Sequence, residues 1–181
     1  MPNPIFKIQK ISKFFERKIV LDDVDLEIGA GEIFGLIGAS GSGKTTLLNV
    51  IIGFLKPETG DVLFRAEHLL DHKNSFSFKS VFAHPEDLRK IVGMASQTPS
   101  FYINLTVKEN LNYFGALYGL SKDSIKSNTS TLINLMDLEG SEDKLSHNLS
   151  GGMQRRLDMA CSLIHDPKVL ILDEPTADLD P

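Results

Sequence analysis

The first part of the chain alternates between apolar and polar residues, a pattern typical of half-buried β-strands. The alternation runs through residues 5–11 and 24–28, and a further strand is expected to begin at 19–21. Glycines at 29–31 then favour a turn. The chain is therefore expected to open with an antiparallel layer of β-strands.

Short apolar runs follow, and these favour short strands and a buried helix. Strands are predicted at 32–37, 61–65, 91–95 and 168–172, and a helix is predicted at 46–52. Strands and helices that follow one another in this way place the chain in the α/β class.

A helical period appears in the second half of the chain, at 106–120 and again at 122–137. Thr106 with Glu109 three residues later predicts a capping box at the start of the first helix. These helices are expected to form a separate small lobe. Residues 66–90 fit no single period, and we interpret them as a buried edge strand with a loop rather than as a partner surface.

The composition restricts the kind of protein further. The chain has 181 residues, of which 41% are apolar, and a formal net charge of -5, which argues against a nucleic-acid partner. Its single cysteine, Cys161, lies in an apolar run and is expected in the core of a protein from a reducing compartment. The longest nearly apolar run, 47–55, is too short to span a bilayer, so any membrane role is expected to need a partner.

Residues 38–45 fit the phosphate-binding pattern G-x-x-x-x-G-K-[ST] at every fixed position. Glycines let backbone N–H groups turn toward phosphate oxygens, Lys44 adds a charge that reaches the β- and γ-phosphates, and the Thr45 hydroxyl suits Mg²⁺. A predicted strand before the loop and a helix after it place the phosphate on a helix dipole. The alternative is a Gly/Ser-rich connector that matches by chance.

The strand at 168–172 ends in two carboxylates, Asp173 and Glu174. A nucleotide site in an α/β sheet requires acids at such a strand end. Asp173 is expected to hold Mg²⁺, and Glu174 is expected to act as general base on the attacking water. The alternative is a strand end with solvated acids.

Ser150, Gly151 and Gly152 precede a helix on which Met153 and Leu157 share an apolar face. The glycines free backbone N–H groups and create a second anion-binding helix start. One nucleotide rarely needs two such sites, so this helix start is interpreted as meeting the phosphate held by another subunit. The alternative is an N-cap without a ligand.

Together these motifs resemble the nucleotide-binding subunit of ATP-binding cassette (ABC) transporters. The family's motifs match in order at 38–45, Ser96-Gln97, 149–154, 169–174 and 177–180. The resemblance implies an α/β fold: a P-loop NTPase core with a mixed sheet, an N-terminal antiparallel β-subdomain and an inserted α-helical subdomain. It also implies one ABC ATPase domain over 1–181, with the β-subdomain and core in 1–97, the helical subdomain in 98–150 and the returning core in 151–181.

The resemblance implies roles for individual residues, with ATP and Mg²⁺ as the cofactors. Catalysis is expected from Glu174, Lys44 and Gln97, and Mg²⁺ binding from Thr45, Gln97 and Asp173. Phe15 is expected to stack on adenine, with Phe14 the weaker choice. The remaining nucleotide-binding residues are expected to be Gly38, Ala39, Ser40, Gly41, Ser42, Gly43, Lys44, Thr45, Thr46, Ser150, Gly151, Gly152 and Gln154. Gln97 is also expected to couple the site to a membrane subunit, and Asp180 to touch the opposite subunit.

The chain departs from the family pattern in two places. Asp178 stands where the family usually has a small residue, and the sequence stops at Pro181, before the strand with a histidine and the helices that the family carries. On this ground the C-terminal strand and helices are expected to be missing, with weak nucleotide binding and poor hydrolysis.

The function implied is an ATP-hydrolysing subunit that powers a membrane transporter, most like the multidrug-export or ABC-2 branch. The expected partners are an integral-membrane permease and a second copy bound head-to-tail, without nucleic acid. The expected location is cytoplasmic, peripheral on the inner face of the cell membrane. Two alternatives remain: a soluble ABC ATPase in translation or DNA repair, and a nucleotide-binding module without catalysis.

Overall fold

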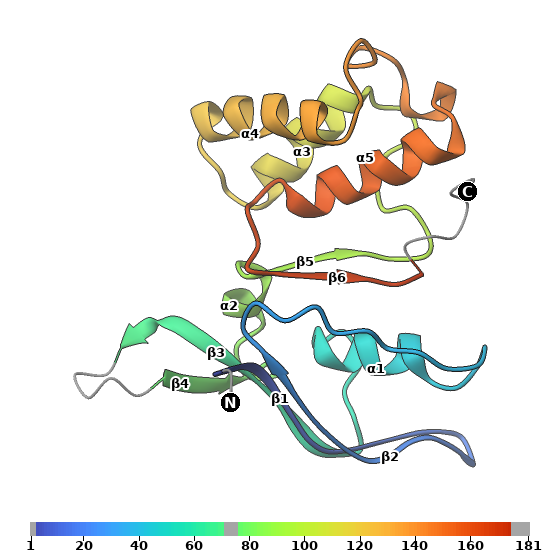
Figure 1. Ribbon diagram of the computed structural model, residues 1–181, viewed down its shortest axis with the longest axis vertical. Helices are drawn as coiled ribbons and strands as arrows, with labels where there is room; N and C mark the ends of the chain where they lie inside the picture. The colour runs from blue at the N-terminus through green and yellow to red at the C-terminus, as the bar shows by residue number, and fades with distance from the viewer. Residues whose placement is uncertain (1–2, 71–75, 175–181) are drawn as a thin grey trace. The chain divides into compact units, whose positions relative to one another are not determined.

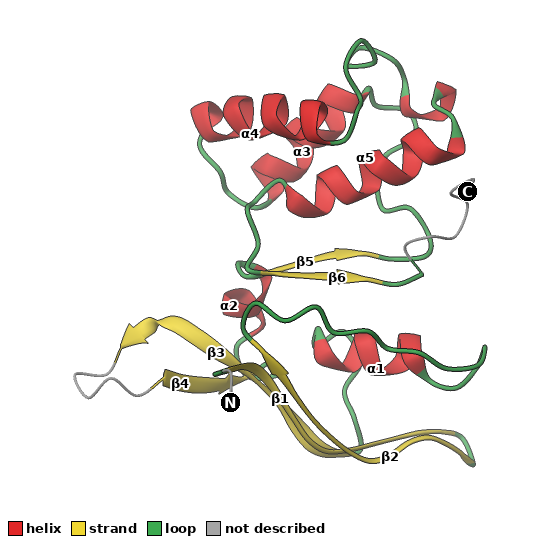
Figure 2. Ribbon diagram, in the orientation of Figure 1, coloured by secondary structure: helices red, strands yellow, loops and turns green. Residues whose placement is uncertain are grey.

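The computed structural model describes residues 3–70 and 76–174, and these form two compact units that meet in sequence at Arg89 and Lys90 (Figure 1). Each unit has its own sheet, as Figure 2 shows by the strands coloured yellow. The predicted division of 1–181 into subdomains stays a prediction.

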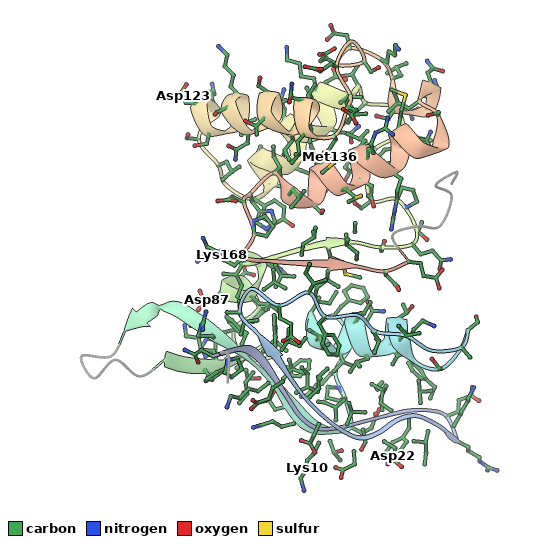
Figure 3. All side chains as sticks on the ribbon, in the orientation of Figure 1. Lys10, Asp22, Asp87, Asp123, Met136 and Lys168 are labelled. Carbon is green, nitrogen blue, oxygen red and sulfur yellow. The ribbon has the colours of Figure 1, made fainter. Side chains whose placement is uncertain are left out.

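The first unit contains a four-stranded antiparallel sheet in the order β2-β1-β3-β4. Its elements are β1 Pro4–Phe15, β2 Lys18–Gly29, α1 Lys44–Ile51, β3 Thr59–Leu70, β4 Phe76–Ser80 and α2 Pro85–Arg89. The alternation of the sequence is borne out, because Phe6, Ile8 and Val62 are buried whereas Lys10 and Asp22 lie on the exposed side of the sheet (Figure 3). The antiparallel opening layer was correctly predicted.

Residues 66–90 contain the edge strand that the sequence predicted, since β4 is the last strand of this sheet. The short helix α2 after it was not predicted. Its first turn carries Glu86 and Asp87, acids that favour a helix start.

The strand predicted at 32–37 is wrong, because these residues form an irregular segment. Ile33 is 100% exposed and Ile37 is 96% exposed. A continuous apolar strand requires strands on its flanks and cover on its faces. Among the described residues no strand pairs with this segment, so its apolar pattern has nothing to pack against.

The second unit contains a pair of parallel strands, β5 Val92–Ala95 and β6 Val169–Leu172, joined in register from Val92↔Val169 to Ala95↔Leu172. The connection between them carries the helices α3 Val107–Leu117, α4 Lys122–Leu135, η1 Ser146–Asn148 and α5 Gly151–Leu163. Helix α5 lies against β5, where a Cβ on Gly93 would collide with the Ser162 carbonyl oxygen. The strands and helices of this unit were all predicted except η1.

The helices of the second unit pack around one apolar cluster, whose members are Phe101, Val107, Leu111, Leu132, Ile133, Leu138, Leu149, Leu157, Ala160, Cys161 and Ile164. Cys161 is buried there as predicted, and burial raises the pKa of its thiol. None of the helices among the described residues has the length and apolar character needed to cross a bilayer.

The predicted capping box at Thr106 is confirmed. Thr106 Oγ1 accepts from the Glu109 N–H at 3.1 Å, and Glu109 Oε2 accepts from the Thr106 N–H at 2.8 Å. These hydrogen bonds lower the pKa of Glu109. Its contribution to stability is therefore present at neutral pH and is lost as the pH falls from the usual glutamate pKa through the lowered one.

Replacing Thr106 by alanine is expected to destabilise the protein by about 1 kcal/mol, because the first turn of α3 loses an acceptor for one of its N–H groups. Urea unfolding followed by circular dichroism measures the change. Thr131→Ala is the matched control, since the exposed Thr131 hydroxyl bonds only within α4, to Ser127. Equal stability of both variants would contradict the role of the cap.

Candidate functional site

The loop at 38–43 is bent by glycines where side chains are disfavoured. Gly41 has φ 73° and Gly43 has φ 97°, both in the left-handed region. A Cβ on Gly43 would also lie 3.0 Å from the Val20 carbonyl oxygen, so the loop runs close to β2. Glycine is therefore favoured at 43 by the backbone conformation, and a side chain there would also crowd Val20.

The start of α1 is open to an anion. Gly43 is its N-cap and provides no side-chain hydrogen bond, and no acid occupies its first turn. The first N–H groups of any helix have no acceptor within that helix, and the helix dipole makes this end positive. The residues of the loop therefore fit a phosphate group.

Lys44 folds back over the same loop. Its Nζ donates to the carbonyl oxygens of Gly38 and Ala39, both at 2.9 Å. An ammonium group has three donors, so a further acceptor can bind there. The predicted set 38–46 thus forms one exposed or half-exposed segment, with the Lys44 ammonium at the backbone of Gly38 and Ala39.

Phe15 ends β1, which pairs with the strand that the loop contacts. It pairs with Lys18 across the β1–β2 turn, and Val20, two residues on, is the residue that contacts Gly43. Phe15 is 47% exposed and Phe14 is 38% exposed, so either ring is accessible. Lys13 Nζ stands 5.5 Å from the Phe15 ring centroid and orients that ring.

Glu58 fixes the position of Lys13, a contact that the sequence did not predict. Glu58 Oε1 accepts from Lys13 Nζ at 2.7 Å, and Oε2 accepts from the Phe14 N–H at 2.9 Å. The hydrogen bond from Lys13 is the main cause that lowers the pKa of Glu58. The strand end that carries Phe15 is therefore held by the residue that precedes β3.

Three predicted residues come together in the second unit. Gln97 lies just beyond β5, and Asp173 and Glu174 lie just beyond β6. Because β5 and β6 are parallel neighbours, their carboxyl ends meet at one edge of the pair. Asp173 is 4% exposed and donates its N–H to the Ala95 carbonyl at 3.0 Å, whereas Gln97 and Glu174 are exposed. This set of an amide and two carboxylates suits a hard cation and an attacking water.

Ser150 caps helix α5. Its Oγ accepts from the Met153 N–H at 3.3 Å. A Cβ added to Gly151 would meet nothing within 4 Å, and one added to Gly152 would meet only Arg156 Nη1, at 3.9 Å. The packing of the described residues therefore does not require these two glycines.

Gln154 makes a hydrogen bond within the second unit, and its predicted contact with nucleotide stays a prediction. Its Nε2 donates to the Ser146 carbonyl oxygen at 3.0 Å and so holds η1 against the start of α5. Of the other predicted residues, Asp178 and Asp180 lie outside the described part of the chain, as does the whole motif at 177–180.

The sequence did not predict the contacts that hold these strand ends. Arg155 reaches the backbone next to Gln97 and at Asp173, and Asp158 holds Ser100. The sequence held only a weak signal for these contacts, namely two charged residues three positions apart on the apolar face of a predicted helix.

A phosphate loop with its lysine, together with acids at the end of a parallel strand, defines the class of P-loop nucleoside triphosphatases. The sequence model of the family described as "ABC transporter" matches residues 21–177. The chain belongs to this family of ABC ATP-binding domains, which are ATPases that act in transport and bind ATP, generally with Mg²⁺. The resemblance seen in the sequence is confirmed.

Known proteins agree with this assignment. The chain is similar to "Nod factor export ATP-binding protein I" of Cupriavidus metallidurans, at 35% identity over 177 residues, which is 98% of this chain and 54% of that protein. The protein of the same name from Paraburkholderia xenovorans is 34% identical over 181 residues, with 100% and 56% covered. The chain thus spans about half the length of these relatives.

The fold is also found in solved structures. That of cbiO1 from Clostridium perfringens, described as part of the ABC transporter complex cbiONQ, has a TM-score of 0.81 and 29% identity, covering 99% of this chain and 68% of that one. A second structure, described as the ATP binding subunit of an ABC transporter, has a TM-score of 0.81 and 27% identity. These confirm the predicted fold class.

Proposed function

We propose that this chain is the ATP-binding and ATP-hydrolysing subunit of an export-type membrane transporter. The observation that carries the proposal is the open start of α1 at Gly43, together with the Lys44 ammonium at the same loop, which suits a triphosphate. The exporters among the relatives support the direction of transport.

In the proposed mechanism the loop at 38–46 binds the phosphates, and Lys44 balances their charge. Thr45, Gln97 and Asp173 have the oxygen donors that would hold Mg²⁺, which supplies charge neutralisation when bound. Glu174 accepts a proton from the attacking water at its carboxylate. Phe15 holds the adenine by stacking.

A second copy of the chain is proposed to complete each site. Ser150, Gly151 and Gly152 form a helix start at which an anion is stabilised. The two glycines leave room for a close approach that the described packing does not use. We assign this approach to the γ-phosphate of a nucleotide held by the other copy, in a head-to-tail dimer.

The permease is proposed to dock on an aromatic patch of the helical lobe, formed by Tyr102, Ile103, Tyr113 and Leu117. These side chains are 49%, 57%, 44% and 67% exposed. The hydroxyl oxygens of the tyrosines are 3.2 Å apart and their ring centroids 4.8 Å apart, so the two rings form a fixed platform. Exposed, rigid aromatic residues of this kind are frequent at protein interfaces. Through this contact the protein would lie on the cytoplasmic face of the membrane.

Replacing Tyr113 by alanine is expected to weaken permease binding by about 2 kcal/mol, or roughly 30-fold, as for a central aromatic residue of an interface. Co-purification from detergent with the membrane protein encoded alongside it measures the loss. The control is Tyr118→Ala. Tyr118 lies outside the patch, and its ring stacks on the His165 ring with the two centroids 3.7 Å apart. Recovery of ribosomes or DNA instead of a membrane protein would contradict the transporter proposal.

Replacing Phe15 by alanine is expected to weaken ATP binding by about 1–3 kcal/mol, the contribution of stacking a base on an aromatic ring. A fluorescent ATP analogue titrated against the protein gives the Kd, and Phe14→Ala is the matched control. Since loss of stacking spares the phosphate contacts, the affinity for free triphosphate should stay unchanged. A larger rise in Kd for Phe14→Ala than for Phe15→Ala would show that adenine stacks on Phe14 instead.

A further inference from the structure

Two charged residues of α5, Arg155 and Asp158, are buried. They are 6% and 0% exposed, and Arg155 Nη1 lies 3.4 Å from Asp158 Oδ2. Burying an ion pair costs desolvation, and such a pair is often no better for stability than apolar residues of similar size. The remaining contacts of these two side chains therefore need to be explained.

Arg155 joins two separate segments to α5. Its Nη1 donates to the Ser96 carbonyl oxygen at 2.5 Å. Its Nη2 donates to the carbonyl oxygens of Asp173 at 3.1 Å and Glu174 at 3.4 Å. A planar guanidinium with five N–H donors can serve several acceptors in a fixed geometry, which an ammonium cannot.

Asp158 holds the far end of the segment that carries Gln97. Its Oδ1 accepts from both the Ser100 N–H and the Ser100 hydroxyl, each at 2.8 Å. Arg155 holds Ser96, at the near end. The exposed Gln97 thus lies in a short loop that is fixed at both ends by side chains one turn apart on α5.

The backbone of Glu174 also needs support. Its φ is 50°, in the left-handed region that residues other than glycine rarely adopt. A conformation of this kind persists where the surrounding contacts hold it. The hydrogen bond from Arg155 to the Glu174 carbonyl is such a contact.

We propose that Arg155 and Asp158 are positioning residues that fix Gln97 and Glu174 relative to each other and to the helix that starts at Ser150. The inference rests on the proposed function, since it takes Gln97 as a Mg²⁺ ligand and Glu174 as the proton acceptor. It predicts that the pair affects turnover and the Mg²⁺ requirement, whereas ATP affinity, set by Lys44 and its loop, is unaffected.

The test compares the wild-type protein with Arg155→Met/Asp158→Leu, Arg155→Lys and Arg89→Ala. The double variant replaces the buried pair by apolar side chains, so its Tm is expected to stay near that of the wild type. Its kcat is expected to fall about 10–100-fold, as when residues that orient metal ligands are removed. The Mg²⁺ concentration for half-maximal rate is expected to rise, with the Kd for ATP unchanged.

Arg155→Lys keeps the charge but cannot reach all three carbonyl oxygens, so only part of kcat is expected to return. Arg89→Ala removes an exposed ion pair with Glu86 and should leave kcat unchanged. A folded double variant or Arg155→Lys variant with wild-type kcat and Mg²⁺ requirement would overturn the inference and leave the proposed function standing. Absence of ATP hydrolysis in the wild type would instead overturn the proposed function, and this inference with it.

Discussion

Replacing Glu174 by glutamine is expected to lower the rate of ATP hydrolysis by about 10²–10⁴-fold, the range for loss of a general base. Glutamine keeps the size of the side chain but cannot accept the proton of the attacking water. Because Glu174 is exposed and follows the end of β6, the fold should not change. Steady-state phosphate release measures the effect.

The same variant should still bind ATP, since the phosphate loop is intact, and should accumulate as an ATP-bound dimer. Light scattering with and without ATP detects that dimer. Glu86→Gln, at an exposed glutamate of α2, is the control for loss of one carboxylate. Turnover that survives Glu174→Gln would show that another group accepts the proton.

Replacing Lys44 by alanine is expected to weaken ATP binding by about 1.5–3 kcal/mol, the contribution of a hydrogen bond to a charged group, or roughly 10–150-fold in Kd. Lys44 Nζ also bonds to the Gly38 and Ala39 carbonyls, so the loop loses order as well as charge. Isothermal titration with ATP measures the Kd.

Lys122→Ala, at an exposed lysine of α4, is the matched control for the loss of one positive charge. Thermal unfolding followed by circular dichroism separates a binding defect from a folding defect in the Lys44 variant. An unchanged Kd for ATP in a folded Lys44→Ala protein would show that the phosphate loop does not bind ATP in the way proposed.

Local sequence patterns predicted most of the fold. The alternation at 5–11 and 24–28 found β1 and β2, and Thr106 with Glu109 found the start of α3. These features depend on neighbours in sequence, so they can be recognised without the tertiary structure. The predicted strand at 32–37 failed because a strand exists only where another strand pairs with it, and the described residues provide none.

In the candidate site, too, the features set by sequence neighbours were predicted and those that depend on distant contacts were not. The phosphate loop and the acids after β6 follow short motifs, and each has a local physical reason. The contacts of Arg155 and Glu58 join segments 59 and 45 positions apart, and sequence spacing carries no signal at that range. Gln154 illustrates the same limit, because its position in the motif carried no signal for the hydrogen bond from its amide to the Ser146 carbonyl oxygen.

The central claim is that each site combines the phosphate loop of one copy with Ser150-Gly151-Gly152 of another. The direct measurement is the ATPase rate of a mixture of two inactive variants, Lys44→Ala and Ser150→Arg. A mixed dimer has one site with both defects and one intact site, so random mixing should restore about a quarter of the wild-type rate in a two-fold head-to-tail dimer. A mixture as inactive as its components, with mixed dimers demonstrated, would contradict the claim.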